Sequence, residues 1–335
     1  MSTRRLVRGL SATVLSLLTL VALPAAASAA GSPVSLRDGV VIDAAQGIAY
    51  IAHPQGGVAA IDLQRGGMLW HSAAAERPLT LSGDLLVAQA RPGGQGELRV
   101  VALDVRRQGA RSAEADLPMP AGIRAEAGET MGHLFRVSAV PSAQGVVVLW
   151  ESQNRPALQR REGPPSGNDA TLASLGAKRT AWGSLQGSAL FDPRAGRLLP
   201  VEADQGLLLA SPSRALAASL AASGGGERRF ASIDGRHVLS SRQVGRLSSA
   251  GNPYLWTISE AATGRVLGSI ESRVSMSPFL VVGDRIVHLG QPKTVRQGST
   301  ISERPLHLHA VDLASGREAW SAVVRDTAFQ GPTPE

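Results

Sequence analysis

The chain contains no cysteine among its 335 residues. This absence excludes disulfide bonds, thiolate metal sites, a cysteine nucleophile and a lipid-modified cysteine after processing. An exported protein without such cross-links depends on its core for stability. A chain of this length can build that core, and its length is typical of one large domain or two small ones.

Lysine and aromatic residues are scarce too. Lys178 and Lys293 are the only lysines, so the basic excess comes from arginines scattered along the chain. The formal net charge is +7, and it becomes 7 − 3 = +4 without the three arginines of residues 1–30, a stretch with no acidic residue. The tightest arginine groups, such as Arg106–Arg107, form no stripe with aromatic stacking partners. We therefore expect no nucleic-acid partner.

No segment after residue 30 reaches the roughly 18 unbroken apolar residues that a membrane-spanning helix needs. The first thirty residues have a different composition. Three arginines precede the apolar stretch 10–23, and the alanine-rich run 25–30 supplies small residues for cleavage near Ala29 or Ala30. This order is typical of a signal peptide, and a retained membrane anchor is the alternative. The stretch 3–7 also hints at twin-arginine export, so the route stays open between that and the general pathway. We predict a signal peptide at 1–30, a single mature domain at 31–335, and a periplasmic or extracellular location.

Familiar catalytic motifs are missing as well. The chain has no Gly-x-Ser-x-Gly elbow and no Ser-x-x-Lys motif, and Gly224–Gly226 is not followed by the Lys-Ser/Thr of a phosphate-binding loop. His307 and His309 alternate, so both lie on one face of a strand, where two ligands could begin a zinc or copper site. The local pattern places no third ligand. We predict no catalytic residue, no cofactor site and no metal site.

The chain does contain a repeated pattern. Residues 59–72 read AAIDLQRGGMLWHS, and residues 310–321 read AVDLASGREAWS. In both, alternating apolar residues lead to Asp, Gly follows four positions later, and Trp four positions after that. Alternation at period two indicates a strand with one face on a core. Asp starts a turn through its side chain, and Gly supplies positive φ, so the pattern predicts a β-hairpin.

Weaker copies of this hairpin occur between the two clear ones. They are 101–109 (VALDVRRQG), 189–198 (ALFDPRAGRL), 231–239 (ASIDGRHVL) and 256–267 (WTISEAATGRVL), where Ser259 takes the place of Asp. A second hairpin, built around Gly-Asp, covers 78–90 and 278–290, and 40–52 follows the same plan with a longer turn. Each module therefore contains two hairpins and four strands.

The corner aspartates define a period. The intervals between successive corners are 42, 88, 42 and 78 residues, and we interpret 88 and 78 as double intervals. A repeat of about 40 residues with four short strands predicts a blade of an all-β propeller. Five repeats are clear, and the period predicts about seven blades. Residues near 153–178 are predicted to be a polar loop insertion, and 211–223 is one candidate helix.

We assign a structural role to the corner and packing residues of the repeat. The aspartates recur, whereas catalysis would need one, and we expect the tryptophans to pack one blade on the next. The set comprises Asp62, Gly66, Trp70, Asp104, Asp192, Gly196, Asp234, Gly264, Asp312, Gly316 and Trp320.

The Asp–x–x–x–Gly–x–x–x–Trp hairpin, preceded by the Gly-Asp hairpin, resembles the repeat of the PQQ-type β-propeller family. The resemblance covers most of residues 38–324. It implies a quinoprotein dehydrogenase with pyrroloquinoline quinone and calcium on the propeller axis and an Asp as base. The chain departs from that pattern because it is shorter, has no cysteine for a vicinal disulfide, and shows no Trp-rich floor. WD-type propellers are the second resemblance, but no blade has a Gly-His…Trp-Asp pair.

We therefore expect a secreted or periplasmic, non-catalytic propeller. It would act as a monomeric binding or assembly scaffold for a protein or peptide partner at the cell envelope, through loops that are not repeated. Two alternatives stay open. One is a PQQ-dependent or other small-molecule oxidoreductase. The other is a carbohydrate- or polymer-binding propeller, although Tyr50 and Tyr254 are the only tyrosines.

Overall fold

The computed structural model describes residues 33–94, 96–121, 123, 125, 128–130, 133–154, 169–179, 184–207, 209, 228–245, 253–290, 294–297, 300–303 and 306–325. The predicted signal peptide at 1–30 and the candidate helix at 211–223 lie outside these residues. The described residues belong to one compact unit, Gly31–Glu335. Within this part of the chain, no helix is long and apolar enough to cross a membrane.

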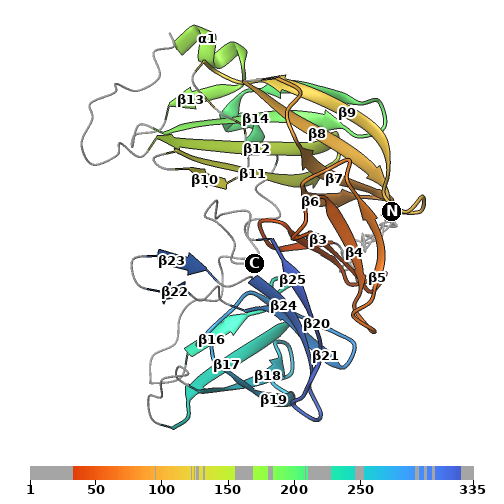
Figure 1. The fold of residues 1–335 in the computed structure, drawn as a ribbon, viewed down its shortest axis with the longest axis vertical. Coiled ribbons are helices and arrows are strands. Elements are labelled where there is room, and N and C mark those ends of the chain that lie inside the picture. Colours follow the sequence, from red (N-terminus) through yellow and green to blue (C-terminus); the bar gives the residue numbers. More distant parts are fainter. Residues whose placement is uncertain are drawn as a thin grey trace, which may run out of the picture. The chain divides into compact units, whose positions relative to one another are not determined.

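Antiparallel sheets make up almost all of the regular structure (Figure 1), which confirms the predicted all-β class. Sheet A has the order β1 (Val34–Arg37), β2 (Val40–Asp43), β3 (Ile48–Ala52), β4 (Val58–Asp62) and β5 (Met68–Ser72). Sheet B has the order β6 (Arg77–Ser82), β7 (Leu85–Ala90), β8 (Glu97–Asp104) and β9 (Ala110–Pro118). Strands that are neighbours in sequence pair with one another, which is the meander of a propeller blade.

Three further sheets follow. Sheet C contains β10 (Gly128–Thr130), β11 (His133–Ser142), β12 (Gly145–Asn154), β13 (Ala177–Arg179), β14 (Leu185–Asp192) and β15 (Arg197–Val201). Sheet D contains β16 (Arg228–Ala231), β17 (His237–Gln243), β18 (Tyr254–Glu260) and β19 (Val266–Ser272). Sheet E contains β20 (Phe279–Val282), β21 (Arg285–Leu289), β24 (Leu306–Asp312) and β25 (Glu318–Val324), and a separate hairpin is formed by β22 (Thr294–Gln297) and β23 (Thr300–Glu303).

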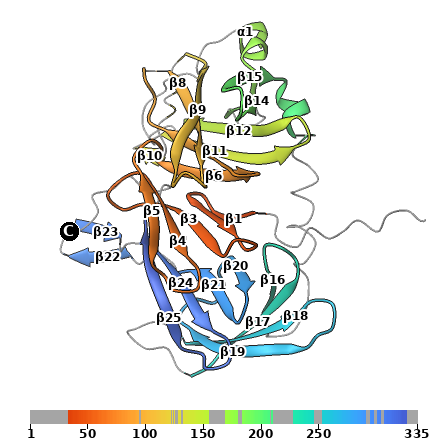
Figure 2. The same cartoon turned by 90° about the vertical axis from the view of Figure 1, so that its right-hand side faces the viewer.

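Four apolar clusters join these sheets face to face. Trp256 of sheet D packs with Phe279 of sheet E, and a second cluster joins sheet E to sheet A. Sheet A packs on sheet B, and sheet B packs on sheet C. The row is therefore D–E–A–B–C, although the chain order is A to E. The first and last sheets of the sequence are neighbours, as Figures 1 and 2 both show.

We call the face that each sheet turns toward the next sheet in this row its forward face, and the opposite face its back face. Sheets E, A and B are covered on both faces by other sheets. None of the clusters among the described residues joins the forward face of sheet C to the back face of sheet D. These two faces are the ends of the row.

The described residues form five sheets of four or more strands, the number of clear repeats, where the period predicts about seven blades. The interval from Asp104 to Asp192 holds sheet C alone, enlarged by the ten-residue strands β11 and β12 and by the segment that precedes β14. The second long interval rests on Asp234, which lies between the first two strands of sheet D and not at a third-to-fourth corner. In sheet D that corner is Glu260, not Ser259, because Gly264 N–H bonds to the carbonyl of Glu260.

The described ends of the predicted loop insertion near 153–178 have regular structure. Residues 155–168 lie outside the described residues, but β12 continues to Asn154. Helix α1 (Asp169–Ser174) and the start of β13 occupy the end of the insertion. Gly176 follows the helix with φ +67°, which is the usual left-handed residue after a helix C-terminus.

Candidate functional site

The corner aspartates of the repeat use their side chains to bind their own turns. Asp62 Oδ1 accepts bonds from the backbone N–H groups of Gln64 at 2.7 Å and Arg65 at 3.1 Å. Asp104 and Asp192 accept the same pair of bonds from the residues two and three positions later. The backbone bonds from Ala195 and Arg194 lower the pKa of Asp192. In these three residues Oδ1 serves the turn, which explains why an aspartate recurs at this position.

The remaining corners vary in detail. Asp312 Oδ1 accepts from the hydroxyl and the backbone N–H of Ser315, both at 2.7 Å, which lowers its pKa. Glu260 instead pairs with Arg265 and Thr263, and these bonds lower its pKa. Asp234 accepts from the hydroxyl of Ser232 at 2.5 Å in the β16–β17 turn. Each of these is a turn contact within a few residues.

The two repeat tryptophans lie over glycines of the neighbouring sheet. Trp320 of sheet E covers Gly66 of sheet A, and its Nε1 donates to the carbonyl of Leu63 at 2.9 Å. Trp70 of sheet A covers Gly109 of sheet B. A Cβ atom at either glycine would overlap the indole, and both glycines have positive φ, +71° and +75°. Gly109 follows Asp104 by five positions and was not among the predicted residues, because the preceding turn is one residue longer.

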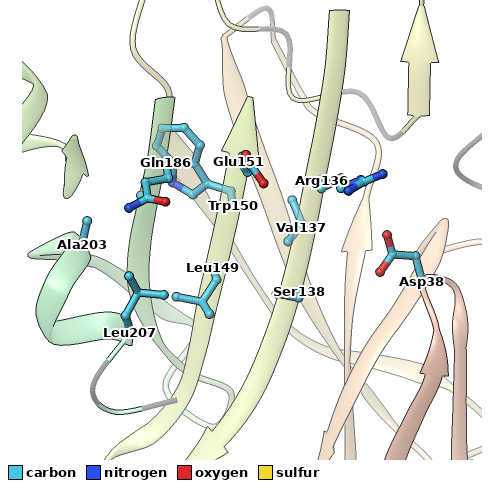
Figure 3. Close-up of a pocket in the computed structure, with 11 residues that line it drawn as sticks. Asp38, Arg136, Val137, Ser138, Leu149, Trp150, Glu151, Gln186, Ala203 and Leu207 are labelled. Carbon is cyan, nitrogen blue, oxygen red and sulfur yellow. The ribbon is translucent and has the colours of Figure 1, made fainter. Parts of the chain in front are cut away.

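A pocket of about 420 Å³ lies over sheet C (Figure 3). Three neighbouring strands line it: β11, β12 and β14. A helical segment, residues 203–207, lies beside it, and the β1–β2 turn of sheet A contributes Asp38. The lining consists of Asp38, Arg136, Val137, Ser138, Leu149, Trp150, Glu151, Gln186, Gly187, Ala203 and Leu207.

The polar residues of this pocket form a row across the strands. Arg136 on β11 is directly opposite Glu151 on β12, which is directly opposite Gln186 on β14. Side chains opposite one another in antiparallel strands share a face, so all three lie on the forward face. Glu151 Oε1 accepts from Gln153 Nε2 at 2.8 Å and from Ser184 Oγ at 3.5 Å.

The row is bordered by an apolar floor. Leu149 and Leu207 lie opposite each other in Figure 3 and belong to one small cluster. Arg136 extends toward the side of the pocket where Asp38 lies (Figure 3). Lys178 on the neighbouring β13 is held by Asp204. The arrangement can bind a group that is polar on one side and apolar on the other.

Sequence reasoning did not find this pocket. Arg136 and Glu151 interrupt the apolar runs LFRVSAV and VVVLWES, and that interruption is the available signal. Their partnership, however, depends on the register of β11 on β12. Asp38 comes from a segment about 100 residues earlier in the chain.

A second cluster of ionisable groups contains histidines. His307 and His309 do lie on one face of β24, with ring centroids 5.8 Å apart. His309 bonds to Glu318 through Nδ1 at 2.6 Å, and His288 on β21 stacks on His309 at 5.3 Å. His288 also meets the ring of Trp256 across the D–E junction at 5.0 Å.

The environment of His288 disfavours its charged form. Burial, together with a smaller effect of the neighbouring His309, lowers its pKa to about 4. The part of the chain that the structure describes contains no group of three or more His, Cys, Asp or Glu side chains that could hold a metal ion. His288 is a buried ring at the junction of sheets D and E.

No family model matches the chain. No curated protein matches it either. Among solved structures, TolB from Acinetobacter baumannii is 12% identical, with 84% of this chain and 50% of that chain covered and a TM-score of 0.23. This chain thus spans half the length of that protein.

Two further solved structures are similar at the same level. A europium-containing methanol dehydrogenase is 14% identical over 83% of this chain and 67% of its own, with a TM-score of 0.24. The computationally designed Ika8 protein is 12% identical over 88% and 74%, with a TM-score of 0.20. Similarities this low carry no argument about activity or ligand. The classification of this chain rests on its own sheets, which are propeller-type blades.

Proposed function

We propose that the protein is an exported, non-catalytic binding and assembly scaffold of the PQQ-like propeller type, and that the pocket on sheet C receives a segment of a protein or peptide partner at the cell envelope. One observation carries the proposal: the repeated carboxylates bind their own turns, whereas Arg136, Glu151 and Gln186 have no counterpart in the repeat and line a cavity. Function then resides in the part of the chain that is not repeated.

The chemistry of the pocket suits a peptide. A peptide segment presents N–H donors, carbonyl acceptors and a partly apolar side chain together. A guanidinium, two carboxylates and an amide above Leu149 and Leu207 can satisfy each of these. The volume of about 420 Å³ falls in the usual range for pockets that take small ligands, so it would hold a short portion of a partner and not a folded surface. A framework of packed sheets binds with little reorganisation.

Site-specific photo-crosslinking tests this proposal. A photoreactive residue replaces Ser138, which is exposed and lines the pocket, and Ser112 on β9 serves as an exposed control outside it. In intact cells we expect one discrete adduct from position 138 and none from position 112. Adding Arg136→Glu should abolish the adduct, whereas Arg107→Glu on an exposed corner should not. Equal labelling from both positions would contradict the proposal.

Two further measurements address the untested parts. N-terminal sequencing of the mature protein should begin near residue 30 or 31 if the chain is exported. Titration of purified protein with pyrroloquinoline quinone and calcium should show no saturable binding and no dye reduction. Dye reduction would show that the protein is an oxidoreductase and would contradict the proposed scaffold role.

A further inference from the structure

One row of polar side chains crosses the forward face of sheet C and the pocket. Arg136, Glu151 and Gln186 are directly opposite one another, and Lys178 on β13 is directly opposite Gln186. Asp204 pairs with Lys178 at that end of the row. These residues supply two cations and two carboxylates, so the row carries both charges without an excess of either.

Arg136 and Glu151 are neighbours that do not pair with each other. Cross-strand partners have Cβ atoms about 5 Å apart, close enough for a guanidinium to reach a carboxylate. Within the described residues, however, no hydrogen bond or ion pair joins these two side chains. Glu151 Oε1 instead accepts from Gln153 and Ser184, both of which are neutral. Arg136 extends away toward the side of the pocket where Asp38 lies (Figure 3), so a bound group can lie between the two charges.

This arrangement disfavours a charged ligand. A cation between the two side chains would be attracted by Glu151 and repelled by Arg136, and an anion would experience the reverse, so the two contributions oppose each other. An amide gains from both, because its carbonyl accepts from a guanidinium and its N–H donates to a carboxylate. The geometry therefore favours a neutral group that has a donor and an acceptor side by side.

The surroundings of the two charges suit a peptide unit. Gln186 lies on the other side of Glu151 and offers a further amide donor and acceptor. Leu149 and Leu207 form the apolar floor beside the row. A peptide unit that lies across the row can place its own apolar side chain on this floor.

We propose that the pocket binds an uncharged main-chain amide of an extended peptide, with the carbonyl at Arg136 and the N–H at Glu151, and that it discriminates against free α-carboxyl and α-amino groups. The inference rests on the proposed function, because it specifies the ligand chemistry of the same pocket. The partner then presents an internal segment of its chain and not a terminus.

Three small probes with the same leucine side chain test the proposal. N-acetyl-leucine N-methylamide has an amide at each end, N-acetyl-leucine ends in a carboxylate, and leucine N-methylamide begins with an ammonium group. Each is titrated into the isotopically labelled protein, and NMR follows the side-chain amide signals of Gln186, which lines the pocket. We expect saturable binding of the diamide, with a Kd about 5- to 10-fold below that of either charged probe.

A fourth probe isolates the contact with Glu151. N-acetyl-leucine methyl ester is uncharged and has the shape of the diamide, but its second amide N–H is replaced by oxygen. It should bind about 5- to 10-fold more weakly than the diamide, because a carboxylate oxygen would face the ester oxygen without a donor. Equal binding of ester and diamide would contradict an N–H bond to Glu151.

Charge variants give a readout that a structural effect would not produce. Glu151→Gln leaves Arg136 without an opposing charge, so N-acetyl-leucine should become the tightest probe. Arg136→Gln leaves Glu151 alone, so leucine N-methylamide should become the tightest. Arg107→Gln, on an exposed corner outside the pocket, is the matched control and should keep the order of the unmodified protein. A variant that only loosened the sheet would weaken all probes alike.

Two results would overturn the proposal. One is a charged probe that binds the unmodified protein as tightly as the diamide does, because the pocket would then accept a chain terminus or a charged side chain. The other is the absence of a saturable shift with the diamide up to about 50 mM. The cross-link from position 138 is a separate measurement. Its absence, with the order of the probes kept, would contradict the scaffold role and leave the amide specificity in place.

Discussion

Sheets A and D have the same meander of strands but opposite patterns of burial. In sheet A, four consecutive residues of β3 and of β4 are buried, because the strands contact sheet E on one side and sheet B on the other. In sheet D, only alternate residues of β18, such as Trp256 and Ile258, are buried. Neighbours on both sides bury consecutive residues of each strand in sheet A, whereas in sheet D the side chains between the buried ones stay partly exposed.

The largest expected effect compares cavities in the two sheets. Ile51 in sheet A is 1% exposed, and Ile51→Ala should cost about 2–5 kcal/mol of unfolding free energy through lost burial and the cavity that remains. Leu255 lies on the open back face of sheet D, where Leu255→Ala should cost about 1 kcal/mol or less. Urea midpoints of the two variants measure the difference. Equal costs would mean that the back face of sheet D is covered.

Acid should weaken the packing of sheet D on sheet E, the one described sheet that it contacts through an apolar cluster. His288 is buried at the D–E junction with a pKa of about 4, against 6.5 for an exposed histidine. The folded state therefore binds fewer protons than the unfolded state, and the stability from this group is complete above pH 6.5 and is lost as pH falls toward 4. The difference of 6.5 − 4 = 2.5 units corresponds to about 3 kcal/mol.

The groups that face His288 set the controls for this prediction. They are Trp256 from sheet D, Phe279 opposite it on β20, and His309, which is held by Glu318. At pH 4.5 the backbone amides of β17–β19 should exchange faster than those of β2–β4. His288→Leu should reduce the pH dependence of this difference. His307→Gln, which removes a half-exposed ring of the same face, should change it less. Simultaneous exchange of both sheets would refute a selective release of sheet D.

Two glycines have the same backbone conformation but different surroundings, so substituting each of them separates the effect of sheet packing on stability from that of backbone conformation. Gly66 and Gly264 have φ +71° and +72°, but only Gly66 lies under an indole. Gly264→Ala should cost about 1 kcal/mol from the conformation alone, and Gly66→Ala about 2–3 kcal/mol because the new methyl group also displaces Trp320. Thermal denaturation of the two variants tests this order. Equal losses of stability in the two variants would show that Trp320 does not hinder a side chain at position 66.

The smallest effect concerns the corner acids. Asp62→Ala removes two bonds to backbone N–H groups and should cost about 1 kcal/mol. Glu260→Ala removes only exposed side-chain bonds to Thr263 and Arg265, so it should cost less stability than Asp62→Ala. The comparison is made by urea denaturation at neutral pH. A larger loss from Glu260→Ala would show that this corner is held differently.

The sequence by itself determined the local structure of this protein. Alternating apolar residues, a corner acid and a following glycine dictate hairpins, because each works through bonds and φ values within a few residues. The chain therefore reads as all-β, and the clear repeats at both ends match sheets A and E. The period led to a wrong position for Asp234. An acid follows a strand both in the turn between the first two strands of a sheet and in the corner before its last strand, and only the strand pairing distinguishes these turns.

Tertiary structure decided the rest. The order D–E–A–B–C depends on which faces are apolar in sheets that lie far apart in the sequence, and the pocket depends on the register that sets Arg136 opposite Glu151. His288 and His309 became partners in the same way, through pairing of β21 with β24. Local preferences specify each blade, whereas long-range burial specifies which blades meet.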